Sequence, residues 1–156
     1  MHSTGNGCTY DDMRSMKNQN YDGIDRLTGL YNGEYALKEI QAYMEQNPEC
    51  TAAVYIMDID NFRTVDETLG RLFGNEIMKE IAAAICQVFG KQAVIGRIGG
   101  DKFLIFEKNY ESVGRIRENA KELCHRARST FKGEDQNFVI SLSIGIAIMP
   151  DDGYEW

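Results

Sequence analysis

The stretch GRIGGDKFLIF, residues 96–106, decides how the rest of the chain is interpreted. Two adjacent glycines separate two apolar runs, which is the pattern of a β-hairpin with a tight turn. The tip of this hairpin carries an acid and a base side by side, Asp101 and Lys102. We therefore expect strands over residues 93–98 and 102–107, with a charged tip between them.

The segments around this hairpin alternate between helix and strand patterns. The run TAAVYIM, residues 51–57, is apolar on both faces and predicts a buried strand that ends at Asp58 and Asp60. Asn32 is suited to cap the helix that precedes this strand. The other predicted elements rest on apolar periodicity and are helices over residues 33–46, 74–89 and 111–131 and a last strand over residues 138–148.

This order, a helix followed by β-α-β-β-α-β, predicts an α+β fold. It is the ferredoxin-like arrangement, in which helices pack on a mainly antiparallel sheet. Residues 1–24 are polar and aperiodic, so we expect them to form a flexible linker or lead-in. A single domain is then expected over residues 25–156.

The composition limits the classes of function. A net charge of −7 over 156 residues does not suit a broad nucleic-acid-binding surface. No apolar run approaches the roughly 20 residues of a membrane span, and the first residues lack the apolar core of a signal peptide. None of the 4 cysteines forms a CxxC pair, which argues against zinc and favours reduced thiols in a cytoplasmic protein. A small phosphorylated ligand remains compatible, because it needs only a few local donors and a cation.

The predicted fold brings acids from separate segments together. Because the strand over residues 51–57 lies beside the hairpin, its carboxyl end carries Asp58 and Asp60 toward Asp101. Such oxygen ligands suit Mg²⁺, which is usually held by one or two carboxylates and by substrate phosphates. An acidic strand end beside a glycine turn is also common without any function.

The residues after this strand predict a second feature of the site. Asn61, Phe62 and Arg63 turn toward a helical stretch, and the backbone N–H groups of such a turn can bind phosphate. Arg63 would add a charge-assisted hydrogen bond. The alternative interpretation is an ordinary turn with a solvated arginine.

Four separated motifs resemble one known family. DRLTGLYN begins at residue 25, AVYIMDIDNF at residue 53, GRIGGDKF at residue 96 and SLSIGIA at residue 141. In this order and spacing they resemble the GGDEF domain of diguanylate cyclases over residues 25–150. The resemblance implies a fold like the palm domains of nucleotidyl cyclases and polymerases. It also implies a reaction in which a dimer, assisted by Mg²⁺ or Mn²⁺, joins two GTP molecules into cyclic di-GMP and releases pyrophosphate.

The resemblance also implies roles for individual residues. Asp58, the backbone carbonyl of Ile59, and Asp101 match the metal ligands, and Asp101 and Lys102 stand at the third and fourth positions of the GGDEF signature. The catalytic positions would be Asp58, Asp101 and Lys102. The nucleotide-binding positions would be Asn61, Phe62, Arg63, Asp66, Asn75, Gly99 and Gly100.

The chain departs from the family pattern at important positions. The fourth signature position is usually Glu, so Lys102 places a cation where an anion is expected. That change either weakens a second metal ion, holds a phosphate, or leaves a lysine pointing to solvent. The guanine-reading pair is exchanged, with Asp66 in place of Asn and Asn75 in place of Asp, which either preserves guanine binding with swapped roles or weakens it. The family's last helix is expected beyond Trp156.

Three hypotheses for function follow. The first is a degenerate GGDEF domain that binds GTP and Mg²⁺, has little or no cyclase activity, and regulates a neighbouring sensor or EAL-type phosphodiesterase domain. The second is an active diguanylate cyclase, which would work as a homodimer. The third is a protein-interaction scaffold in which the acids are remnants. In each case we expect no contact of this domain with nucleic acid or membrane.

Overall fold

The computed structural model describes residues 23–130 and 139–151. The predicted lead-in over residues 1–24 lies almost entirely outside the described residues. The elements are β1 (Tyr31–Asn32), α2 (Gly33–Gln46), β2 (Ala52–Ile59), α3 (Phe62–Leu69), α4 (Arg71–Phe89), η2 (Gly90–Gln92), β3 (Ala93–Arg97), β4 (Lys102–Lys108), α5 (Val113–Thr130) and β5 (Leu142–Met149).

The strands form one mixed sheet in the order β1-β3-β4-β2-β5. All neighbouring strands are antiparallel except β1 and β3, which are parallel. The four longer strands have the order expected for a ferredoxin-like fold, with β4 between β2 and β3. The predicted α+β class is therefore confirmed. The short strand β1 was not predicted, because a strand of two residues carries no periodicity. Its place in the sheet depends on pairing with β3, far along the chain.

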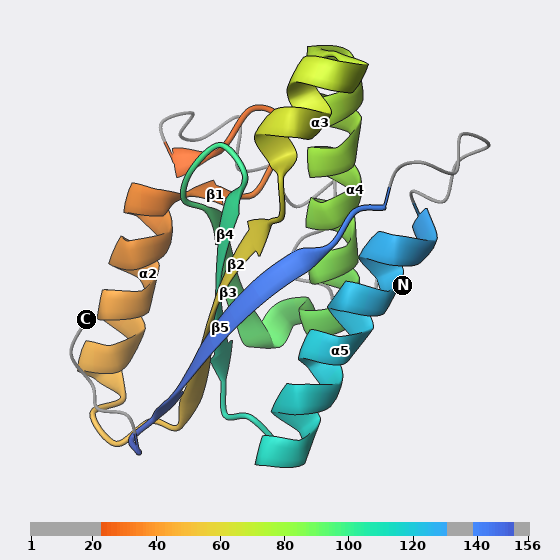
Figure 1. Cartoon of the computed structure of the whole chain (residues 1–156). Helices are drawn as coiled ribbons and strands as arrows, with labels where there is room; N and C mark the ends of the chain where they lie inside the picture. Colours follow the sequence, from red (N-terminus) through yellow and green to blue (C-terminus); the bar gives the residue numbers. More distant parts are fainter. Residues whose placement is uncertain (1–22, 131–138, 152–156) are drawn as a thin grey trace, which may run out of the picture.

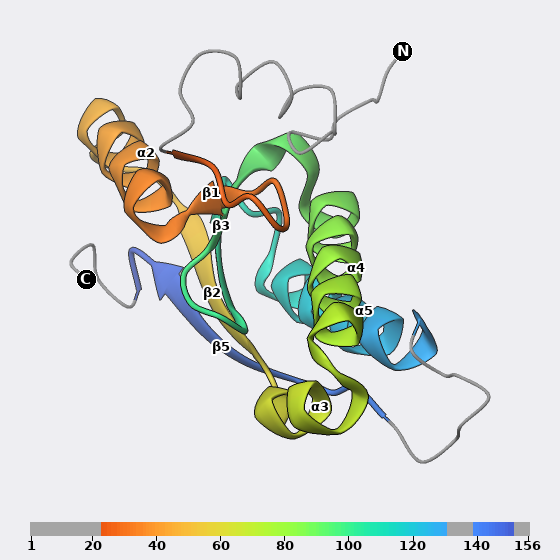
Figure 2. The same cartoon turned by 90° about the horizontal axis from the view of Figure 1, so that it is seen from above.

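Helices cover both faces of the sheet (Figures 1 and 2). The strand side chains alternate between the two faces, as the pleat requires. Tyr55 and Ile105 belong to the core cluster that includes α4 and α5 residues, whereas Val54 and Phe106 pack with α2. The prediction that the first long strand is buried on both faces is confirmed for most of β2.

The helix over residues 33–46 is confirmed with its cap, since the Asn32 side chain accepts a hydrogen bond from the Tyr35 N–H at 2.8 Å. The prediction of a helix starting near residue 74 was wrong at its beginning. Helix α4 starts at Arg71, and α3 precedes it as a separate helix. Gly70 divides the two with a φ of 89°, a conformation that glycine adopts without strain. Only Val65 of α3 is buried, so the sequence pattern there was weak.

The remaining boundaries shift by a few residues. Strand β2 runs to Ile59, so Asp58 lies inside the strand and only Asp60 follows it. Helix α5 starts at Val113, and β5 starts at Leu142 instead of near residue 138. Among the described residues, no helix combines the length and apolar character needed to cross a bilayer.

Candidate functional site

The hairpin tip lies beside the carboxyl end of β2. The antiparallel register pairs Asp58 directly with Lys102, and the Ile59 N–H donates to the Asp101 carbonyl at 3.2 Å. The tip is closed by the Ile98 N–H, which donates to the Lys102 carbonyl at 2.9 Å. The start of α3 lies at the same end of the molecule (Figures 1 and 2). The topology thus brings Asp58 and Asp101 together, as the sequence predicted.

Two pockets meet at this end and share Phe62, Arg63 and Asp101. The first has a volume of about 620 Å³ and the second about 330 Å³. The first is also lined by Asp58, Ile59, Asp60, Asn61, Ser141 and Ser143. The second is also lined by Asp66, Arg71, Asn75, Met78, Arg97 and Gly100. Most of the predicted site residues therefore line one continuous region, whereas Gly99 and Lys102 line neither pocket.

The carboxyl of Asp58 affects the ionisation of Asp101. Burial raises the pKa of Asp101, and the neighbouring carboxyl of Asp58 raises it further. Asp58 Oδ1 is a buried atom without a hydrogen-bond donor among the described residues. A buried acceptor without a donor is costly, so this atom is suited to a cation.

The residues present fit one divalent cation. Asp58 and Asp101 offer carboxylate oxygens, and Ile59 on the same pocket wall offers a backbone carbonyl. Within the described part of the chain, no three His, Cys, Asp or Glu side chains come close enough to form a complete metal cage. Further ligands would have to come from water or phosphate, which is how Mg²⁺ is commonly bound.

Lys102 meets Asp58 directly. Its Nζ lies 3.3 Å from Asp58 Oδ2, and about half of each side chain is exposed. The two residues are cross-strand partners, so their side chains lie on the same face of the sheet. Lys102 therefore does not simply point to solvent.

Asp60 faces a different neighbour from Asp58. Its carboxylate accepts hydrogen bonds from Ser141 Oγ at 2.7 Å and Ser143 Oγ at 2.5 Å. These two hydrogen bonds hold the pKa of Asp60 below its usual range. Asp60 lines the same pocket as Asp101, and its carboxylate is bound by the hydroxyls of Ser141 and Ser143 at the start of β5.

The predicted phosphate-binding turn is the first turn of α3. Asn61 has a left-handed conformation, with a φ of 55°, and its side chain does not cap the helix. The first N–H groups of a helix have no partner within it, so they remain available to an anion. Arg63 lies at the pocket edge and pairs with Glu67 at 3.1 Å, and its side chain is largely exposed.

The exchanged pair Asp66 and Asn75 lines the second pocket from α3 and α4. A methyl group on Gly74 would come within 2.5 Å of Asp66 Oδ1, so this glycine makes room for the carboxylate. In the same pocket, a methyl group on Gly100 would meet nothing within 4 Å. The protein's own packing does not require glycine there, which fits a position that a ligand approaches closely.

Two arginines of this region were not among the predicted binding residues. Arg71 lines the second pocket because α4 starts before residue 74, which the sequence pattern did not reveal. Arg97 donates from Nη2 to the Gly100 carbonyl at 2.6 Å and from Nη1 to Asp25 Oδ1 at 3.1 Å. It therefore fastens the hairpin tip to the segment before β1.

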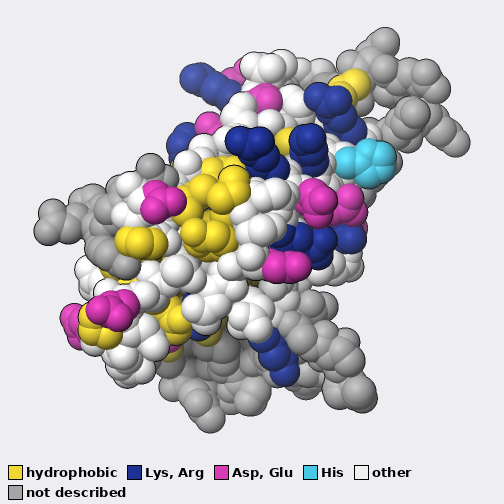
Figure 3. Space-filling view, turned by 90° about the horizontal axis from the view of Figure 1, so that it is seen from below, with side chains coloured by type: hydrophobic (Ala, Val, Ile, Leu, Met, Phe, Trp, Pro, Cys, Tyr) yellow, Lys and Arg dark blue, Asp and Glu magenta, His cyan; other side chains and the backbone are white. Residues whose placement is uncertain are grey.

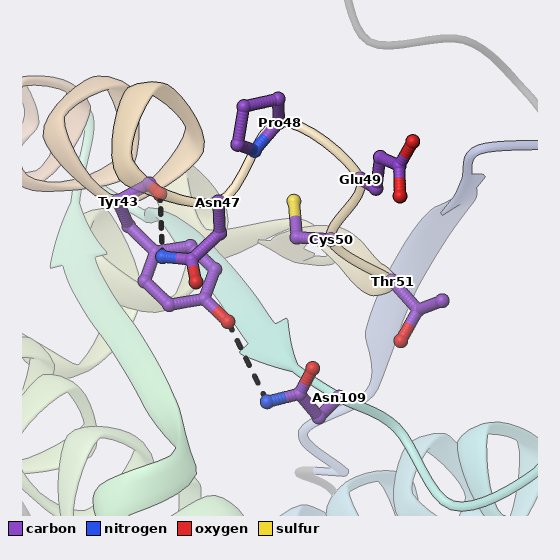
Figure 4. A pocket seen from close by; sticks show the side chains of 7 residues that line it. All are labelled: Tyr43, Asn47, Pro48, Glu49, Cys50, Thr51 and Asn109. Carbon is purple, nitrogen blue, oxygen red and sulfur yellow. Dashed lines mark hydrogen bonds between the residues drawn. The ribbon is translucent and has the colours of Figure 1, made fainter.

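A third pocket lies at the other end of the sheet, between the end of α2 and the end of β4 (Figure 4). It has a volume of about 560 Å³, and none of the predicted site residues lines it. Tyr43 and Asn109 face each other across it at 3.5 Å. Figure 3 shows this lower end of the molecule, where hydrophobic side chains gather among charged ones. The residues that line this third pocket include one acid, Glu49, and no group of acids like that at the hairpin tip.

The family whose sequence model is described as "Diguanylate cyclase, GGDEF domain" matches residues 23–156. The chain therefore belongs to the GGDEF domain family. The fold agrees with this assignment. The GGDEF domain of DgcB from Caulobacter crescentus, solved in complex with c-di-GMP, matches with a TM-score of 0.70 and 24% identity, over 81% of this chain and 77% of that one.

Curated relatives are much longer than the part of them that this chain matches. The cyclic di-GMP phosphodiesterase PdeR of Escherichia coli (strain K12) is 30% identical over 129 residues, which are 83% of this chain and 19% of PdeR. The bifunctional diguanylate cyclase/cyclic di-GMP phosphodiesterase MucR of Pseudomonas aeruginosa is 33% identical over 131 residues, with the same two shares. The chain thus spans about a fifth of these relatives.

Proposed function

We propose that this chain is a degenerate GGDEF domain with a regulatory role in cyclic di-GMP signalling. It binds GTP together with a divalent cation and has little or no cyclase activity. The observation that carries this proposal is the ion pair of 3.3 Å between Lys102 and Asp58. A lysine stands at the signature position where the family usually has Glu, and it contacts the carboxylate that matches the family's first metal ligand.

The two adjoining pockets suggest how the nucleotide lies. The phosphates would contact the first turn of α3, near Asn61 and Phe62, with Asp58 and Asp101 on the cation beside them. The base would enter the second pocket between Asp66 and Asn75 and pass close to Gly100. A bound Mg²⁺ would supply neutralisation of the phosphate charge.

The regulatory part of the proposal rests on the relatives. One is named as a phosphodiesterase and the other as a bifunctional cyclase and phosphodiesterase, and each extends far beyond the matched region. A domain that senses GTP beside a phosphodiesterase or sensor domain fits this arrangement.

Calorimetry with GTP and Mg²⁺ tests the binding part. We expect a binding heat for the wild-type protein and none for Asp58→Ala with Asp101→Ala. Absence of heat for the wild type would remove the GTP-binding role. If the double variant also left the regulation of the full-length protein unchanged, the scaffold hypothesis would take its place.

An active cyclase is the second candidate, because Asp58 and Asp101 are both present and the space above Gly100 is open. Incubation of concentrated protein with GTP and Mg²⁺ or Mn²⁺, followed by chromatography, separates the two functions. We expect no cyclic di-GMP. Product formation by the wild type, abolished by Asp101→Ala, would establish the cyclase instead.

A further inference from the structure

Lys102 is fixed to one particular oxygen of the site. The β2–β4 register places it opposite Asp58, and its Nζ lies 3.3 Å from Oδ2. The other oxygen, Oδ1, is buried and has no donor among the described residues. The two oxygens of one carboxylate thus differ, since one already has a cation and the other has none.

The charges around Asp58 set how many further cations can be held. Asp58, Asp101 and Lys102 together carry one negative charge when both acids are ionised. An acid at position 102 would make that total three negative charges. Asp60 does not alter the comparison, because its carboxylate, which accepts hydrogen bonds from Ser141 and Ser143, adds the same negative charge to both totals. A second divalent ion would lie against an ammonium and an already neutralised oxygen, which is electrostatically unfavourable.

We infer that Lys102 is a tethered cation that occupies Asp58 Oδ2 and restricts this site to a single divalent ion, held by Asp58 Oδ1 and Asp101. This inference deepens the proposed function, on which it rests, by naming what the altered signature does. The ammonium takes the place of one metal ion and is not merely a defect in the site.

Manganese alone is the probe that tests this inference, because bound Mn²⁺ is lost from the electron paramagnetic resonance spectrum of the free ion. The titration uses the full chain without nucleotide. We expect one bound Mn²⁺ per chain for the wild type. Lys102→Gln should still bind one ion, about tenfold more tightly, because it removes a neighbouring positive charge. Lys102→Glu should bind two ions, and Asp58→Asn should bind none.

Lys108→Glu is the matched control, because it makes the same charge change at the far end of the same strand. Its side chain lies over the Tyr43 ring and not at the hairpin tip. We expect it to bind Mn²⁺ as the wild type does. Circular dichroism of each variant checks that it is folded.

Three results would overturn the inference. The first is two bound ions in the wild type, and the second is no bound ion in either the wild type or Lys102→Glu. The third is the same number and affinity of bound ions in both proteins. A parallel titration with the slowly hydrolysed analogue GTPγS distinguishes this failure from that of the proposed function. If GTPγS does not bind while the Mn²⁺ counts are as expected, the GTP role fails and the tethered cation stands.

Discussion

Asp58 and Asp60 are two residues apart, yet their carboxylates contact different partners. Asp58 lies in β2 and pairs across the sheet with Lys102. Asp60 follows the strand and is bound by the two serine hydroxyls, Ser141 and Ser143. One acid is therefore available to a cation, whereas the other joins the end of β2 to β5.

The hydrogen bonds that Asp60 accepts from Ser141 and Ser143 predict a pH dependence of stability. Its pKa is lowered in the folded protein, so its stabilising contribution is present above the unfolded pKa and is lost as the pH falls through the folded pKa. Asp60→Asn should lower the free energy of unfolding at pH 7 by about 1–2 kcal/mol and by less in acid, where the wild type has already lost this contribution. Urea unfolding at several pH values measures this.

Ser143→Ala serves as its control, because it leaves Ser141 to bind the carboxylate. We expect Ser143→Ala to lower the free energy of unfolding by about half as much as Asp60→Asn does. If Asp60→Asn lowered the free energy of unfolding by the same amount at neutral and acid pH, the stabilising role of the ionised Asp60 carboxylate would be contradicted.

At the scale of elements, a partly buried polar network ties α5 to the sheet. Tyr55 donates to Glu107 Oε1 at 2.7 Å, and Asn119 Nδ2 donates to Oε2 at 3.2 Å. Burial raises the pKa of Glu107, although both hydrogen bonds act in the other direction. Because the folded pKa is raised, the contribution of Glu107 to stability decreases as the pH rises through it.

Tyr55→Phe should therefore cost more at neutral pH than in acid. Removing the hydroxyl leaves the ionised carboxylate with one donor fewer, and we expect a loss of about 1–3 kcal/mol at pH 7. The loss should be smaller near pH 4, where protonated Glu107 needs that donor less. Chemical unfolding at the two pH values measures the difference. Tyr43→Phe is the control, since its hydroxyl accepts a hydrogen bond from Asn109 Nδ2 at 3.5 Å in an exposed setting.

Two glycines near the junction of α3 and α4 are required for different reasons. Gly70 has a φ of 89° and open space around it, so Gly70→Ala should cost about 1–2 kcal/mol from backbone strain alone. Gly74 is helical, but its methyl group would come within 2.5 Å of Asp66 Oδ1. Gly74→Ala should therefore displace Asp66 and weaken GTP binding more than Gly70→Ala does. Thermal unfolding and calorimetry of both variants check this, and equal effects on GTP affinity would refute it.

At the scale of the whole molecule, one ion pair links distant parts of the chain. Arg97 and Asp25 are 72 residues apart, lie 3.1 Å from each other, and are about four-fifths buried. Asp25 also accepts hydrogen bonds from the N–H and Oγ1 of Thr28. The segment before β1 is thereby fastened to the hairpin tip that carries Asp101.

Breaking this pair should destabilise the hairpin tip more than the sheet. We expect Arg97→Ala or Asp25→Ala to cost about 2–4 kcal/mol, because each leaves a largely buried partner unpaired. The double variant should cost less than the sum of the two. Arg97→Lys should not restore stability, since a lysine lacks the fork that reaches both Asp25 and the Gly100 carbonyl. Urea unfolding of the two single variants and the double variant measures these losses. If the losses of the single variants added up to that of the double variant, the two residues would not be coupled.

Local sequence patterns were sufficient to predict the fold class, the hairpin and the acids at its tip. Continuous apolar runs in the strands and three-and-four spacing in the helices are local patterns, so they can be recognised in the sequence alone. The topology then required the end of β2 to meet the hairpin, which placed Asp58 near Asp101.

The partners of the polar side chains could not be predicted in this way, because they depend on the packing of the whole chain. That Lys102 contacts Asp58, that Asp60 turns to Ser141 and Ser143, and that Arg97 joins Asp25 depend on strand register and on chain segments far apart in sequence. The division of residues 62–89 into α3 and α4 was also not predicted from the sequence. Helix α3 buries only one residue, and a single glycine, Gly70, separates the two helices. Local patterns encode which face of an element is apolar, but the contacts of a polar side chain are fixed only when the packed elements bring particular atoms together.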